Sequence, residues 1–378
     1  MWTRTGYLRT ENKYKFEIYI YLKYYNKMNI LQDSESARVE IVDKIEDGEI
    51  VILPSNGVFT FNTNIFNDKS IEKIYELKQR ETNTPLSVAV KDYEMAKSLI
   101  DMDSLTPSEL EIIETLTTEF WPGMLSIVVK TKMDNKLYSL NNYISLECPD
   151  HSVVQSIFNQ LEKPIITTSA NIHKKSSCSN IEHVKSYFEM NDSITALDFD
   201  TPPRNGIENT IIKIVDSSIA IIRPGPITFE DISELLIDKD IGFSMDFQSD
   251  TIHGVTPRHY SIDKNCCLVN FITCDKLDAS INALTTKYLA NSILVDFGKK
   301  NIEKKAICGG YVDLSEDGDI KEALFNLFNV LHQLNKTELN NILFVDLYAP
   351  NIGLYKTIKD RLDKCCNCKK MFIPLYYD

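Results

Sequence analysis

A hydroxyl and a side-chain amide stand directly after one predicted strand of this sequence. Residues 164–168 form a largely apolar run, and Ser169 and Asn171 follow it. At the end of a strand in an open sheet, side chains project into a crevice rather than into the core. A hydroxyl and an amide placed there can form hydrogen bonds with the phosphate and ribose of a nucleotide. The alternative is an ordinary polar turn, because Ser and Asn are favoured at any strand end.

The sequence also supplies two cations, Lys78 and Arg80, close to the end of a predicted helix. Asn67 can cap that helix, whose apolar residues 71, 74 and 75 have helical spacing. Two cations at this spacing suit a carboxylate or a triphosphate, and an arginine can bind either group through a bidentate fork. The alternative is a solvated, charged helix end.

Other polar groups lie next to predicted strands or in a polar segment. Arg223 ends an apolar run and precedes Pro224 and Gly225, so it could meet a nucleotide or form a salt bridge at a sheet edge. Asn209 stands just before another apolar run. His259 belongs to the string Arg258-His259-Tyr260, which lies within a polar stretch without steady periodicity.

Short apolar runs predict the strands that position these groups. Thr106 and Glu109 form a capping box that begins a helix leading to Trp121. The strands are mixed with helices without a regular βαβ alternation, which favours an α+β, mixed-sheet domain. The predicted strands of this domain are 49–54, 85–90, 125–130, 164–168, 210–215 and 219–223.

The rest of the chain has a different pattern, typical of a small open α/β domain of Rossmann-like type. It alternates predicted strands at 266–272, 291–297 and 341–347 with helical patterns near 277–289, 320–335 and 354–366. We therefore divide the chain into a poorly ordered extension (1–30, with Met28 as a candidate start), a mixed-sheet domain (31–235), a linker (236–262) and a small α/β domain (263–378).

Composition excludes several classes of protein. The 378 residues are 43% hydrophobic and 25% charged, which is typical of a folded globular chain. An uninterrupted run of about 18 apolar residues is absent from the sequence, so we expect no spanning helix and no membrane partner. The net charge of −13 excludes a general polycation for nucleic acid. Nine irregularly spaced cysteines favour reduced thiols in the cytoplasm. The C-x-x-C at 365–368 could ligate a metal, but no second pair with zinc spacing completes four ligands.

Four strings follow one another along the sequence: Lys78-Gln79-Arg80, Trp121-Pro122-Gly123, residues 164–171 (PIITTSAN) and Ile222-Arg223-Pro224-Gly225. In this order they resemble the YrdC-like threonylcarbamoyl-adenylate synthases. Two more, Arg258-His259-Tyr260 and residues 353–362, are similar to motifs of the long members of that family. They select the two-domain type, in which a YrdC-like mixed-sheet domain is followed by a linker and the small α/β domain.

The resemblance implies a nucleotidyltransferase that condenses L-threonine, bicarbonate and ATP into threonylcarbamoyl-AMP and releases pyrophosphate. It implies Mg²⁺ bridging the phosphates, and a transferase complex that then modifies tRNA. Direct contact with tRNA is a further expectation. Carried over by position, the catalytic residues are Lys78 and Arg80. The implied substrate- and ATP-binding residues are Ser55, Lys78, Arg80, Ser169, Asn171, Ser177, Asn209, Arg223, His259 and Tyr260.

The sequence departs from the family pattern in the expected pocket. Gly57 and Phe59 lack hydroxyls that the family carries in its threonine loop. Asn209, which follows Gly206-Ile207-Glu208, stands where the family has a serine, and Glu147 stands where it has an arginine. A carboxylate close to a triphosphate repels it unless Mg²⁺ intervenes. The alternative function is therefore a catalytically weakened member that binds nucleotide or RNA as a regulator or scaffold. A carbamoyl-handling module of hydrogenase maturation is disfavoured, because residues 353–362 resemble the long synthases.

Overall fold

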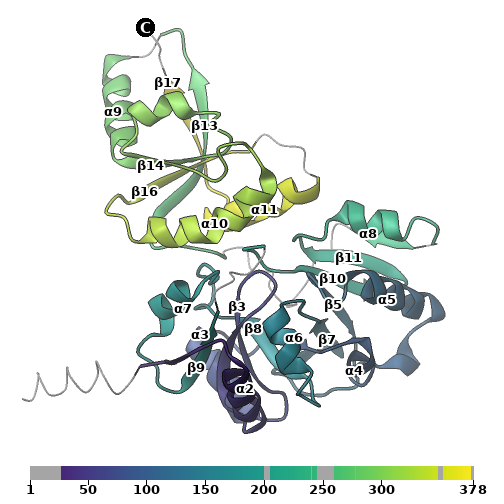
Figure 1. Ribbon diagram of the computed structural model, residues 1–378. Helices are drawn as coiled ribbons and strands as arrows, with labels where there is room; N and C mark the ends of the chain where they lie inside the picture. Colours follow the sequence, from purple (N-terminus) through teal and green to yellow (C-terminus); the bar gives the residue numbers. More distant parts are fainter. Residues whose placement is uncertain are drawn as a thin grey trace, which may run out of the picture.

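The computed structural model describes residues 27–199, 205–239, 241–244, 259–276, 278–347 and 352–375. These residues form two lobes, each built on its own β-sheet (Figure 1). Most of the predicted N-terminal extension and Arg258 lie outside the described residues. Within the described part, no helix is both long enough and apolar enough to cross a bilayer.

The large lobe contains a mixed sheet of twelve strands, as the resemblance implies. Its neighbours pair parallel at β1/β9, β9/β2, β4/β7, β5/β10 and β11/β12, and antiparallel elsewhere. In spatial order the strands are β1 (Asn29–Gln32), β9 (Ile194–Asp198), β2 (Ile50–Pro54), β3 (Phe59–Asn64), β8 (Ile165–Ser169), β4 (Ser87–Ala89), β7 (Tyr143–Glu147), β5 (Leu125–Lys130), β10 (Thr210–Val215), β11 (Ser218–Arg223) and β12 (Gly242–Ser244), with β6 (Ser139–Leu140) beside β7.

Helices cover this sheet through two separate hydrophobic cores. One core joins α2 (Glu35–Glu46) and α6 (Ser152–Phe158) to the sheet through residues such as Ile41 and Ile157. The other receives the apolar residues of α3 (Asp68–Lys78), α5 (Pro107–Phe120) and α7 (Ile181–Phe188), including Ile74 and Leu116. The remaining helices of the lobe are short: α4 (Tyr93–Lys97), η1 (Met102–Ser104) and α8 (Phe229–Leu235).

Local signals in the sequence set the helix ends that matter for the site. The Asn67 side chain accepts a hydrogen bond from the Ser70 backbone N–H and caps α3, and the Thr106–Glu109 capping box begins α5, both as predicted. Gln79 ends α3 in the left-handed region at φ 51°. The chain therefore turns sharply between Lys78 and Arg80.

The small lobe is a five-stranded, all-parallel sheet, which confirms the predicted open α/β domain. The helix predicted at 320–335 is found at those residues. The elements, with strands in spatial order, are β15 (Gly310–Asp313), β14 (Ser292–Asp296), β16 (Asn341–Val345), β13 (Asn265–Thr273) and β17 (Lys370–Leu375), with α9 (Ala279–Ala290), η2 (Ile302–Ala306), α10 (Ile320–Asn335) and α11 (Gly353–Cys365).

Helices α10 and α11 form the side of the small lobe that faces the large lobe (Figure 1). His332 of α10 stacks on His183 of α7, with ring centroids 3.8 Å apart and planes 7° apart. The His332 Nε2 atom lies 3.0 Å from the Ser177 carbonyl oxygen. Burial lowers the pKa of His183 to about 3 and that of His332 to about 4, so both rings are neutral near pH 7.

This stack predicts an acid-sensitive contact between the lobes. In the unfolded chain both rings take up a proton below their ordinary pKa of 6.5, whereas the folded rings resist it until about pH 4. The stability of the folded state is therefore full above pH 6.5 and falls as the pH drops toward 4. His332→Gln should reduce this slope by up to about 1.4 kcal/mol per pH unit. Urea unfolding of both proteins between pH 4 and pH 7 tests this, and equal slopes would contradict it.

Candidate active site

The ends of several strands of the large sheet border one open cavity, which encloses about 710 Å³ including the part continuous with solvent. Strands β3, β4, β5, β7, β8, β10 and β11 each contribute at least one residue to its wall. The lining is largely polar, so the cavity suits a charged, hydrogen-bonding ligand. Its polar side chains are Ser55, Thr60, Arg80, Ser87, Ser126, Glu147, Thr167, Thr168, Ser169, Glu208, Asn209, Arg223 and His259.

The predicted site residues separate into two groups. Ser55, Arg80, Ser169, Asn209, Arg223 and His259 line the cavity together. Lys78, Asn171, Ser177 and Tyr260 are buried and stand outside its lining.

Arg80 is fixed at the cavity wall by backbone carbonyls. Its Nε donates to the Thr84 oxygen at 3.1 Å, and its Nη2 donates to the Pro85 oxygen at 3.1 Å. Burial lowers the pKa of Arg80 to about 10, against a smaller raising effect of Tyr75. The guanidinium therefore stays charged at neutral pH and presents a fixed positive group to a ligand.

Lys78 supports the wall instead of reaching the cavity. Its side chain is 1% exposed, and its Nζ donates to the backbone oxygens of Ser169 and, at 3.1 Å, Asn171. Burial, with a smaller contribution from Arg80, holds the pKa of this ammonium group well below its usual range. Lys78 thus ties the end of α3 to the corner that follows β8.

Asn171 also serves the wall. Its Nδ2 donates to the carbonyl oxygens of Ile172 at 2.8 Å and Lys175 at 2.9 Å. The amide of Asn171 therefore closes the loop after β8, and the hydroxyl of Ser169 is the group of this corner that lines the cavity.

His259 and Tyr260 come from the segment before the small lobe. The Tyr260 backbone N–H donates to His259 Nδ1 at 3.0 Å, so this ring nitrogen is unprotonated. Burial, followed by Lys364 and Arg223, holds the pKa of His259 well below its usual range. His259 therefore faces the cavity as a neutral ring, whereas Tyr260 packs against Phe328 of the small lobe.

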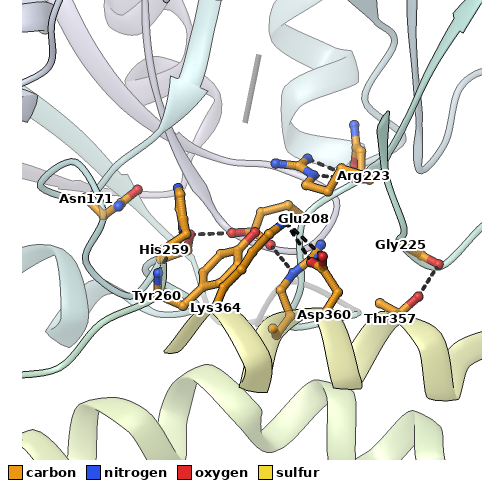
Figure 2. A network of polar contacts seen from close by, with 12 residues as sticks. Asn171, Glu208, Arg223, Gly225, His259, Tyr260, Thr357, Asp360 and Lys364 are labelled. Carbon is orange, nitrogen blue, oxygen red and sulfur yellow. Dashed lines mark hydrogen bonds and ion pairs between the residues drawn. The ribbon is translucent and has the colours of Figure 1, made fainter. Parts of the chain in front are cut away.

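A second guanidinium and an acid lie close together on the same wall. Arg223 donates from Nε and Nη2 to the Asn209 carbonyl oxygen at 3.0 and 2.8 Å (Figure 2). Glu147 accepts hydrogen bonds at Oε2 from the Ser126 hydroxyl at 3.1 Å and the Asn209 amide at 3.4 Å. Burial raises the pKa of Glu147, and Ser126 and Arg223 partly offset this effect.

Two family models match the chain in succession. A model described as "Telomere recombination" matches residues 43–225, and a model described as "Threonylcarbamoyl-AMP synthase, C-terminal domain" matches residues 227–366. The chain belongs to the two-domain threonylcarbamoyl-AMP synthase family. The family that the sequence motifs resemble is therefore confirmed.

Relatives of this synthase family match over different lengths. Threonylcarbamoyl-AMP synthase of Pyrococcus abyssi is 25% identical over 350 residues, which are 89% of this chain and 96% of that protein. The Bacillus subtilis protein of the same name is 28% identical over 222 residues, so this chain spans 62% of that relative's length. The crystal structure of P. abyssi Sua5 complexed with L-threonine has a TM-score of 0.74 and 21% identity, covering 92% of this chain and 99% of that one, and shows the shared fold.

The structure explains one departure from the synthase family pattern. A Cβ atom at Gly57 would lie 1.7 Å from the Ile207 carbonyl oxygen. A side chain at position 57 is therefore excluded by backbone, and the hydroxyl that the family carries there has no room in this chain.

Six polar residues that line this synthase-family cavity were not predicted as site residues from the sequence: Thr60, Ser87, Ser126, Thr167, Thr168 and Glu208. Ser126 interrupts the largely apolar strand β5, a signal that the sequence does show, whereas Thr168 lies in the polar end of β8 directly before Ser169. Glu208 belongs to the string Gly206-Ile207-Glu208 before Asn209, and nothing in that string predicts that its side chain lines the cavity. Arg361 lies in the small lobe, and nothing in the local sequence connects it to the cavity.

The placement of Lys78 predicts a loss of stability when its side chain is removed. Lys78→Met leaves two buried carbonyl oxygens without their donor, which should lower the free energy of unfolding by about 1 to 3 kcal/mol. Lys73→Met is the control, because Lys73 lies exposed on the same helix in a surface ion pair with Glu76 and should change stability by less than about 0.5 kcal/mol. Urea unfolding measures both. An unchanged stability together with lost ATP binding would instead show that Lys78 contacts the ligand directly.

Proposed function

We propose that this protein is a threonylcarbamoyl-AMP synthase. The observation that carries the proposal is a polar cavity at the strand ends with two guanidinium groups, Arg80 and Arg223, fixed by backbone carbonyl oxygens. The same activity is named for the relatives from P. abyssi and B. subtilis.

The reaction joins three small substrates, and each bond change balances without a covalent enzyme intermediate. The threonine amine attacks bicarbonate to form a carbamate, with loss of water. A carbamate oxygen then attacks the α-phosphorus of ATP, and pyrophosphate leaves. The protein's task is to position the reactants and to neutralise their charge.

The cavity residues divide this task by their chemistry. Arg80 and Arg223 supply fixed positive charge for the threonine carboxylate and the triphosphate. The hydroxyl groups of Ser55 and Ser169 supply hydrogen bonds to the same ligands. The neutral ring of His259 forms part of a wall that limits the access of water to the labile carbamate.

The family resemblance implies Mg²⁺ with ATP, and one residue of the cavity fits it. Magnesium is usually held by one or two carboxylates together with substrate phosphates. Glu147 fits, because the hydrogen bonds from Ser126 and Asn209 both go to Oε2. Glu208 does not fit, because Ser177 and Arg361 occupy its two oxygens. When bound, the ion would neutralise phosphate charge and would remove the repulsion between Glu147 and the nucleotide.

The cysteines and the net charge bear on the compartment of the protein and on its contact with tRNA. All nine cysteines are free thiols, which supports a reducing compartment such as the cytoplasm. The product would pass to a transferase complex that modifies tRNA. With a net charge of −13, any direct contact with tRNA would depend on a local basic surface.

A second function, nucleotide or RNA binding without synthesis, is favoured by Glu147 alone, because its carboxylate would repel the triphosphate.

The deciding experiment measures pyrophosphate release from ATP by the full chain with threonine and bicarbonate, singly and together. Synthesis requires both co-substrates. Nucleotide binding without such release would leave the regulatory or scaffold function.

Arg80→Gln should reduce pyrophosphate release at least about tenfold, because a charge-assisted contact to an anionic substrate is lost. Arg38→Gln is the matched control, since Arg38 lies on α2, pairs with Asp33 just before that helix and does not line the cavity. Equal rates for the two variants would remove Arg80 from the site.

Glu147→Gln tests the magnesium assignment. If Glu147 holds the ion, the Mg²⁺ concentration for half-maximal rate should rise several-fold, because a charged ligand becomes neutral. If Glu147 only repels ATP, the variant should instead bind ATP more tightly with the same Mg²⁺ midpoint, and this gain should shrink with added salt. Mg²⁺ titrations at fixed ATP separate the two outcomes.

A further inference from the structure

Helix α11 of the small lobe reaches two segments that flank the cavity. Thr357 and Arg361, one helical turn apart, are both buried. The Thr357 hydroxyl donates to the Gly225 carbonyl oxygen at 2.9 Å, and Arg361 Nε donates to Glu208 Oε2 at 3.3 Å (Figure 2). Gly225 follows the cavity residue Arg223 by two positions, and Glu208 lines the cavity itself.

Arg361 is a charged side chain enclosed by specific partners. It is 0% exposed, and its Nη1 donates to Asp360 Oδ2 at 2.6 Å. Its Cζ lies 5.1 Å from the centroid of the Tyr260 ring, within the range of a cation–π contact. Tyr260, Glu208 and Asp360 raise the pKa of Arg361 despite its burial, so it is a permanent cation.

Glu208 depends on this cation. Its Oε1 accepts a hydrogen bond from the Ser177 hydroxyl at 2.5 Å, and its Oε2 accepts the Arg361 contact. Glu208 is only 7% exposed, and it forms part of the cavity wall. A buried carboxylate that loses its cation stays as an uncompensated negative charge.

The backbone around Glu208 is also held by the small lobe. A Cβ atom at Gly206 would lie 2.4 Å from the Phe325 carbonyl oxygen of α10, and Gly206 has a φ of +62° that favours glycine. The segment 206–208 is thus packed against α10 and α11 on one side and contacts Gly57 of the cavity loop on the other.

We propose that Arg361 is a positioning residue of the synthase site, by which the small lobe neutralises Glu208 and fixes the cavity wall formed by Glu208 and His259. The inference rests on the proposed function and deepens it, because it makes the second domain a part of the site. Arg361 does not line the cavity, and it acts through Glu208 and through the ring of Tyr260. Lys364 and Asp360, which pair with each other at 2.9 Å, complete the charged surroundings.

The test uses the full chain and steady-state pyrophosphate release with ATP, threonine and bicarbonate. Arg361→Met should raise the KM for ATP at least about tenfold with a smaller change in kcat, because the free carboxylate of Glu208 then repels the nucleotide. Adding Glu208→Gln to Arg361→Met should recover most of that KM, since the repelling charge is removed. Arg361→Lys should fall between the wild type and Arg361→Met.

The control is Lys359→Met on the same helix, because Lys359 pairs with Asp346 and Asp363 rather than with residues of the cavity. It should leave both kinetic constants unchanged.

If Arg361→Met lowers kcat and stability in parallel and Glu208→Gln gives no recovery, Arg361 has a structural role and the proposal is wrong. If Arg361→Met fails to fold, the KM of Arg361→Lys with and without Glu208→Gln decides in the same way. A wild-type chain that releases no pyrophosphate would refute the proposed function instead, and ATP titration of the same variants would still test the charge pairing.

Discussion

The cavity depends on one short strip of backbone, Gly206-Ile207-Glu208, that both lobes hold in place. On one side the Ile207 carbonyl occupies the space that a side chain at Gly57 would need, and on the other the Phe325 carbonyl occupies the space next to Gly206. Both obstacles are backbone atoms, which cannot rotate away as a side chain can. A shift of the small lobe therefore moves the strip, and with it the wall that carries Glu208.

The two arginines of the cavity keep their charge unpaired in a strongly acidic chain because neutral groups anchor them. Arg80 donates to two carbonyl oxygens and Arg223 to a third, and Lys78 behind the wall donates to two more. A carbonyl oxygen fixes a cation without cancelling its charge, whereas a carboxylate would do both. Arg361 differs, because it is paired with Glu208 and Asp360. These two carboxylates balance the charge of Arg361 inside the protein, so the charge is not available to a ligand, as expected of a positioning residue.

The sequence predicted the elements whose ends carry strong local signals. The cap at Asn67, the capping box at Thr106 and the helix 320–335 depend on contacts within a few residues, and the structure has all of them. Strand β3 was missed because its second half, Asn62-Thr63-Asn64, is entirely polar although the strand is paired on both sides. Strand β12 (Gly242–Ser244) lies inside the predicted linker and pairs with β11, a long-range contact that local patterns do not record.

For the candidate site, the sequence motifs predicted segments that border the cavity, but not the direction of each side chain. Ser169 and Arg80 line the cavity as expected, whereas Asn171 and Lys78 of the same motifs point into the protein. The difference comes from the left-handed turn at Gln79 and from the loop after β8, which together place the Lys78 ammonium group under the corner. Arg361 could not be predicted, because its role needs the small lobe to be docked on the large one.

Glu147 and Asn209 are best understood as one change in the cavity. Where the family pattern has an arginine and a serine, this chain has an acid and an amide, and the amide reaches the acid at 3.4 Å. A serine side chain is shorter, so its hydroxyl would leave this contact unmade. The carboxyl group is further held by Ser126 and faces the charge of Arg223, which itself binds the Asn209 carbonyl oxygen. An arginine at position 147 would neutralise phosphate directly, whereas a carboxylate can do so only with a cation between it and the nucleotide. Under the proposed magnesium assignment, the paired exchange would place part of the positive charge at the phosphates on a bound metal ion.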